Sequence, residues 1–173
     1  MGTVIFRRAL PEDAYLWATT RQKAWAATYR GIYPDEWIDN YDLAGKMAKD
    51  RKNLDDLAII SYVAMDEELC VGYFSYGPTE NGAFYLRNLY FLPGYQGMGL
   101  GRRAFSCLQN DCIRLGFSEF YVHCNYHNLP ARRFYEHMGG IYTGNNGFHE
   151  NKAEDQCRYD YRITDLCPEG ERK

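Results

Sequence analysis

The chain has 173 residues, of which 46% are hydrophobic and 25% are charged, and its formal net charge is −3. This length suits one domain with its own core, which we place at residues 1–167, followed by a disordered tail at 168–173. The charge balance excludes the strongly basic surface of a nucleic-acid-binding protein.

The cysteines and the N-terminus indicate the compartment. The six cysteines contain no C-x-x-C pair and no zinc-like spacing, so we expect reduced thiols and no metal site. The N-terminal apolar run is too short for a signal peptide, and no apolar run approaches the roughly 20 residues that span a bilayer. We therefore predict a cytoplasmic protein that binds neither membrane nor nucleic acid.

The first part of the chain reads as a strand followed by helices. Residues 4–8 favour a short strand. Pro11, followed by two acidic residues, is typical of the first turn of a helix, which we expect to run to Tyr29. A second short helix is expected after Pro34, and a third over residues 43–53.

The middle of the chain favours strands. Residues 57–65, 69–77 and 83–92 are rich in β-branched and aromatic side chains. Asn81 and Gly82 form the dipeptide that is most typical of a tight hairpin turn. Three consecutive antiparallel strands are therefore predicted.

The rest of the chain alternates between helix and strand. We expect a helix at 99–115, a strand at 119–124, a helix at 129–137, and strands at 141–143 and 157–163 joined by a loop at 144–155. A strand, a helix and a strand in succession form a crossover, so the strands at 83–92 and 119–124 should be parallel. The predicted fold class is α+β (α/β), with a mixed, mostly antiparallel sheet of about six or seven strands and helices on both faces.

A glycine-rich loop lies between the strand at 83–92 and the helix that follows. Gly97, Gly99 and Gly101 precede a helical first turn, whose unpaired N–H groups and positive dipole suit a phosphate. The glycines could instead serve the turn alone. No lysine follows them, which excludes a P-loop. A Rossmann pattern fits Gly99, Gly101 and Ala104, with Glu119 as its acid, but these glycines do not directly follow a first strand.

Two blocks of the sequence resemble one family. Residues 96–101, Gln-Gly-Met-Gly-Leu-Gly, are similar to the Gln/Arg-x-x-Gly-x-Gly/Ala signature of the GCN5-related N-acetyltransferases (GNAT). Residues 128–140, Asn-Leu-Pro-Ala-Arg-Arg-Phe-Tyr-Glu-His-Met-Gly-Gly, resemble the later motif of that family, Asn-x-x-Ala-x-x-Phe-Tyr-Glu-x-x-Gly-Phe. Only Gly140 departs from it. With the strands around the two blocks, the resemblance covers nearly the whole chain.

The resemblance implies a cofactor and the residues that bind it. In this family a parallel pair of strands splays apart at the centre of the sheet, and acetyl-CoA fills the gap as acyl donor. The residues that match the cofactor-binding positions, or lie close to them, are Leu89, Tyr90, Phe91, Gln96, Gly97, Met98, Gly99, Leu100, Gly101, Arg102, Asn128, Arg132 and Tyr135. Asn128 could also be simply the N-cap of its helix.

The same resemblance assigns a general acid but leaves the base open. Tyr135 occupies the position of the tyrosine that protonates the departing thiolate. Many relatives carry a carboxylate on the strand before the glycine loop, yet residues 83–92 contain no Asp or Glu. The alternatives are Glu80, His123 or an ordered water held by nearby tyrosines. A weakly basic amine would need no strong base.

The acceptor side is expected near the first helices. Trp25, Tyr29 and Tyr33 match a variant common in the family and could line the acceptor pocket, or they could be core contacts. The resemblance thus implies an acetyl-CoA-dependent N-acetyltransferase that acts on a primary amine of a small molecule, peptide or protein by direct attack in a ternary complex. The alternative is a non-catalytic acyl-CoA-binding sensor or interaction domain. The sequence does not exclude a homodimer.

Overall fold

The structure is a computed structural model that describes residues 3–146 and 150–163. Its strands are β1 (Ile5–Arg8), β2 (Ile60–Asp66), β3 (Leu69–Pro78), β4 (Phe84–Phe91), β5 (Glu119–Asn125), β6 (Ile141–Asn146) and β7 (Gln156–Arg162). Its α-helices are α1 (Ala14–Tyr29), α2 (Asp35–Asp39), α3 (Leu43–Asp55), α4 (Leu100–Arg114) and α5 (Leu129–His137). Short 3₁₀ turns are η1 (Pro11–Asp13), η2 (Pro93–Tyr95) and η3 (Lys152–Glu154). The tail predicted at 168–173 lies outside the described residues.

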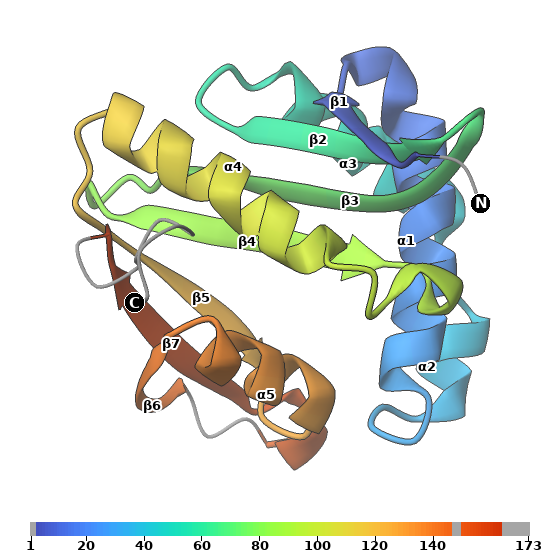
Figure 1. Cartoon of the computed structure of the whole chain (residues 1–173). Coiled ribbons are helices and arrows are strands. Elements are labelled where there is room, and N and C mark those ends of the chain that lie inside the picture. The colour runs from blue at the N-terminus through green and yellow to red at the C-terminus, as the bar shows by residue number, and fades with distance from the viewer. Residues whose placement is uncertain (1–2, 147–149, 164–173) are drawn as a thin grey trace.

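The strands form one seven-stranded sheet in the order β1-β2-β3-β4-β5-β7-β6 (Figure 1). β4 and β5 are parallel, and every other neighbouring pair is antiparallel. A parallel pair needs a crossover, which α4 supplies. The predicted fold class is therefore confirmed.

Helices cover both faces of the sheet. α4 crosses the front face in Figure 1, and its buried side chains, including Phe105 and Leu108, join the larger core cluster. α1 lies behind the sheet and packs through Trp17, whose ring centre is 4.5 Å from that of Tyr73 on β3. No helix in the described part of the chain is long and apolar enough to cross a bilayer.

Two predicted boundaries were wrong. β2 begins at Ile60 instead of residue 57, because Asp56 forms a turn in which its side chain accepts a hydrogen bond from the N–H of Ala58. β6 extends through residues 144–146, where the polar sequence predicts a loop. β6 is an edge strand, so pairing with β7 holds these residues in the sheet without an apolar pattern.

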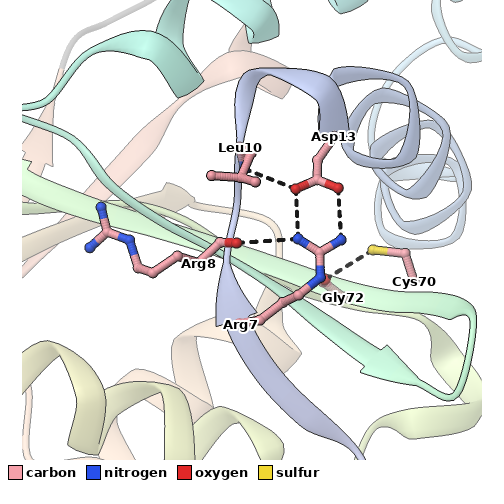
Figure 2. Close-up of polar contacts among 6 residues, drawn as sticks. All are labelled: Arg7, Arg8, Leu10, Asp13, Cys70 and Gly72. Atoms are coloured by element: carbon pink, nitrogen blue, oxygen red, sulfur yellow. Dashed lines mark hydrogen bonds and ion pairs between the residues drawn. The ribbon is translucent and has the colours of Figure 1, made fainter.

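A buried carboxylate anchors the start of α1 to β1. Asp13 accepts two hydrogen bonds from the guanidinium of Arg7, each 2.7 Å long (Figure 2). The same carboxylate accepts a 2.8 Å bond from the N–H of Leu10. Arg7 holds the pKa of Asp13 below its usual value. This bidentate pair fixes the direction in which α1 leaves the sheet.

Candidate active site

The two parallel strands separate along their length. β4 pairs with β5 only at Tyr85 with Tyr121 and at Leu86 with Val122, although both strands continue beyond these positions (Figure 1). A β-bulge precedes the separation, because Arg87 is the extra residue of β4 opposite β3. A bulge bends its strand and changes the direction of the side chains. Two cavities lie where the strands diverge.

The first cavity is a groove of about 610 Å³, which we call the long groove. It runs between the end of β4, the glycine loop with the first turn of α4, and one side of α5, and the last turn of α1 also borders it. The predicted cofactor residues that line it are Leu89, Tyr90, Phe91, Gln96, Gly97, Gly99, Leu100, Gly101, Arg102, Asn128 and Tyr135. The structure thus brings most of the predicted set to one place.

The glycine loop has the geometry of an anion site. Gly97 and Gly99 have φ angles of +75° and +74°, which favour glycine, and Gly99 is the N-cap of α4. The N-cap glycine has no side chain that could cap this end of the helix. A Cβ at Gly97 or Gly99 would meet no atom within 4 Å, whereas a Cβ at Gly101 would lie 2.9 Å from the ring of Phe134. Gly101 therefore permits close packing of α4 on α5, and the other two glycines leave the backbone amides accessible.

Other predicted cofactor residues have structural contacts. Gln96 ties the loop to β4, because its side-chain amide donates to the carbonyl of Phe91 at 3.0 Å. Asn128 is the N-cap of α5 and accepts from the N–H of Ala131 at 3.2 Å, so the N-cap interpretation holds in this structure. Met98 is exposed and does not line the groove.

Arg132 contacts residues that do not line the long groove. Its Nε donates to the hydroxyl of Tyr159 at 3.2 Å, and its Nη1 donates to the carbonyl of Tyr126 at the same distance. It lines neither cavity. Nothing in this geometry supports a contact between Arg132 and the cofactor.

The second cavity, of about 160 Å³, is rich in tyrosine, and we call it the tyrosine cavity. Its lining residues are Tyr29, Tyr33, Tyr85, Leu86, Arg87, Asn88, Leu89, Tyr90, Val122, His123, Cys124, Asn125, Asn128, Ala131, Tyr135 and Gln156. These come from β4, β5, α5, β7 and the end of α1 with the turn after it. The cavity is therefore assembled from segments that are far apart in the sequence.

Of the three predicted acceptor residues, Tyr29 and Tyr33 line this cavity and Trp25 packs behind them. The hydroxyls of Tyr29 and Tyr90 are 3.0 Å apart, and the amide of Asn125 donates to the hydroxyl of Tyr33 at 3.3 Å. Trp25 does not line the cavity but packs against Tyr29 and Tyr33, with ring centres 5.1 and 5.4 Å away. Burial raises the pKa of Tyr29 and of Tyr33, so both phenols stay neutral at neutral pH.

Tyr135 lies where the two cavities meet. It lines both of them, and its side chain is buried. α5 holds it in place, and the hydroxyl of Tyr161 donates to its backbone carbonyl at 2.8 Å. Burial raises the pKa of the Tyr135 phenol well above its ordinary value, so the group keeps its proton at neutral pH.

The two candidate bases have different surroundings. His123 lines the tyrosine cavity and lies beside the stacked rings of Tyr85 and Tyr121, with ring centres 5.6 and 5.2 Å away. Burial first, and then the charge of Arg158, lower the pKa of His123. Glu80 is exposed in the turn between β3 and β4 and lines neither cavity.

Neither cavity has a carboxylate that could act as the general base among the described residues. Among the described residues, neither cavity is lined by Asp or Glu. Within residues 3–146 and 150–163, no three His, Cys, Asp or Glu side chains form a group that could hold a metal ion.

The sequence analysis missed Arg87, Asn88 and Asn125 as residues that line the tyrosine cavity. Arg87 could have been noticed as the lone charged residue of the strand at 83–92.

Comparison with known proteins agrees with the predicted family. The sequence model of the acetyltransferase (GNAT) family matches residues 17–140. No curated protein sequence matches the chain. Among solved structures, the PaiA N-acetyltransferase of Thermoplasma acidophilum in complex with coenzyme A has a TM-score of 0.78 at 19% identity, over 92% of this chain and 99% of that chain.

Two further solved structures have the same fold. An acetyltransferase from Thermus thermophilus has a TM-score of 0.72 at 19% identity, over 92% of this chain and 97% of that chain. An aminoglycoside 6'-acetyltransferase type Ii has a TM-score of 0.65 at 17% identity, with the same coverages. At these identities the likeness shows the fold and leaves the acceptor open.

Proposed function

Because the chain belongs to the acetyltransferase (GNAT) family, we propose that it transfers an acetyl group from acetyl-CoA to a primary amine. The observation that carries this proposal is the meeting of the long groove and the tyrosine cavity at Tyr135. Donor and acceptor would bind together, each in its own cavity, and the amine would attack the thioester directly.

The long groove suits acetyl-CoA in shape and in chemistry. The amides of the glycine loop and the first turn of α4 would bind the diphosphate. Beyond Leu86, β4 has no partner in β5, so its backbone can pair with the amides of pantetheine as a neighbouring strand would. When bound, acetyl-CoA supplies the activated acyl group.

Tyr135 would protonate the leaving thiolate. The phenol is protonated at neutral pH, and its place between the cavities would put the proton near the breaking bond. The thioester C–S bond breaks as the amine nitrogen forms its bond to the acetyl carbon. The phenol then gives its proton to the sulfur.

His123 is the better supported of the two candidate bases. It lines the acceptor cavity, and its lowered pKa leaves the imidazole neutral at neutral pH, so it can accept a proton. Exposed Glu80 would have to act from outside the cavity. We therefore assign to His123 the removal of the proton from the acceptor amine.

A thiol-release assay tests the proposal. The chain is incubated with acetyl-CoA and a panel of primary amines, and free coenzyme A is measured together with the mass of the product. We expect release that depends on the amine and a product heavier by one acetyl group. Release without amine, or no acetylated product from any amine, would contradict the transferase assignment.

A second function has one observation in its favour. Because no Asp or Glu lines either cavity among the described residues, the chain could bind an acyl-CoA without turning it over, as a sensor or interaction domain. Calorimetry separates the two. Micromolar binding of acetyl-CoA without any acetylated product would favour the binding domain.

A further inference from the structure

Arg87 is the one arginine among the described residues that line the tyrosine cavity. It is the extra residue of the β4 bulge, it lines the cavity, and it is half-buried. Its guanidinium lies 5.8 Å from the ring centre of Tyr85, which lines the same cavity. The bulge therefore brings a permanent positive charge to the acceptor side of the site.

The guanidinium of Arg87 has few partners. Its Nη2 donates to the carbonyl of Pro78 at 2.9 Å, and its Nε is buried without an acceptor. No carboxylate among the described residues pairs with it. Arg7, by contrast, makes two bonds to the carboxylate of Asp13. A half-buried guanidinium with unused donors is the arrangement that an incoming anion would complete.

The other residues that line the tyrosine cavity also favour an anionic ligand. The described lining residues include no Asp or Glu that could neutralise Arg87, and the remaining polar groups near it are neutral phenols and amides, with His123. Asn88 is held by its bond to Ser75 at 2.8 Å. In a partly buried site a charge of one sign attracts the opposite sign more strongly than in water.

We propose, on the basis of the transferase function above, that the acceptor is a small primary amine that carries a carboxylate, and that Arg87 binds this carboxylate. The cavity volume of about 160 Å³ favours a small acceptor. A closed cavity of about 150 Å³ holds one benzene molecule, so short amino acids and aminobenzoates are suitable probes for this open one.

Matched pairs of amines test the proposal. The probes are 3-aminobenzoate against 3-aminobenzamide, and β-alanine against β-alaninamide, which differ in the carboxylate alone. Each is assayed with acetyl-CoA and the wild-type chain, Arg87→Gln, and the control Arg8→Gln. Arg8 is exposed, lies over the ring of Tyr62 at 5.4 Å, and lines neither cavity, so this control removes an equal charge elsewhere.

For at least one pair we expect the wild type and Arg8→Gln to have a kcat/KM about 10- to 100-fold higher for the carboxylate, because hydrogen bonds to charged groups have this strength. Arg87→Gln should reduce that ratio to within about threefold, with acetyl-CoA affinity and melting temperature close to wild type. An equal or higher rate with the amide in both pairs, or an unchanged ratio in Arg87→Gln, would overturn the proposal.

A binding measurement separates this inference from the proposed function. Each probe is titrated by calorimetry into the chain saturated with coenzyme A. If no amine is acetylated, yet the carboxylates bind and Arg87→Gln abolishes that binding, the transferase function fails and the carboxylate site stands. If amines are acetylated and carboxylates have no advantage in rate or binding, the function stands and the carboxylate site fails.

Discussion

The long groove and the tyrosine cavity share Tyr135 but are built from different parts of the chain. The contacts proposed for the cofactor in the groove are backbone groups, namely the edge of β4 that has no β5 partner beyond Leu86 and the amides beside Gly97 and Gly99. The cavity is formed by side chains from distant segments, among them Tyr29 and Arg87. Binding through backbone groups can persist when side chains are substituted, whereas a cavity lined by side chains changes its specificity when those side chains change.

Tyr135→Phe should have the largest effect, because this phenol serves both regions. Removal of a general acid costs about 10²- to 10⁴-fold in turnover. Acetyl-CoA affinity should stay within about threefold, since the ring remains. The thiol-release assay and calorimetry measure the two quantities.

Tyr29→Phe is the matched control for that variant. It also removes a hydroxyl from the tyrosine cavity, but one that bonds to Tyr90 and does not reach the long groove. We expect a loss of less than about tenfold. If the two variants lose equal activity, Tyr135 has no special role as the acid.

His123→Gln tests the cavity alone and should cost about 10²-fold in turnover. Because the pKa of His123 lies below its ordinary value, the imidazole is neutral at pH 7 and becomes protonated only in more acidic solution. Wild-type kcat/KM should therefore fall only in solution more acidic than the range in which an ordinary histidine titrates, and the variant should lose this acidic limb.

Glu80→Gln is the control for the base. Glu80 is exposed and lines neither cavity, so activity should stay within about twofold of wild type. A large loss in Glu80→Gln together with a small loss in His123→Gln would reverse the assignment of the base.

Gly99→Ala tests the groove and should weaken acetyl-CoA binding about tenfold. Gly99 has a φ of +74°, where a Cβ costs about 1–2 kcal/mol, so the backbone that presents the amides would shift. Gly82→Ala is the control, because Gly82 has a φ of +75° and also has open space around it, but lies in the β3–β4 turn. Calorimetry should show weaker binding for Gly99→Ala and unchanged binding for Gly82→Ala, at similar losses of stability.

Asp13→Asn lies outside both regions and should leave turnover and acetyl-CoA affinity unchanged. Loss of the Arg7 pair should lower the free energy of unfolding at pH 7 by about 1–3 kcal/mol. Since Arg7 lowers the pKa of Asp13 in the folded state, the pair stabilises the chain above the unfolded pKa of about 3.9 and is lost as the pH falls further. Denaturant unfolding should therefore show a difference at pH 7 that disappears in strong acid.

The sequence predicted the groove much better than the cavity. The spacing of Gly97, Gly99 and Gly101 and the block at 128–140 are local patterns, and they indicated the loop, the crossover and Tyr135 correctly as parts of one region. The place of Arg87 depends on a bulge in the pairing of β4 with β3, which no local pattern specifies.

The strand boundaries failed for a related reason. The polar residues at 144–146 join β6 because β7 offers a free edge, and Leu57 is excluded from β2 by a turn despite its apolar side chain. In both places tertiary pairing or turn chemistry outweighs hydropathy. Edges and bulges are therefore where the sequence was least informative, and the bulge in β4 also positions Arg87, which we propose binds the acceptor.

A crystal structure of the chain with bound coenzyme A would test the central claim most directly. The account predicts the diphosphate on the amides between Gln96 and Arg102, pantetheine alongside the unpaired end of β4, and the sulfur within hydrogen-bonding distance of the Tyr135 hydroxyl. Coenzyme A bound elsewhere, or a sulfur far from that hydroxyl, would contradict it.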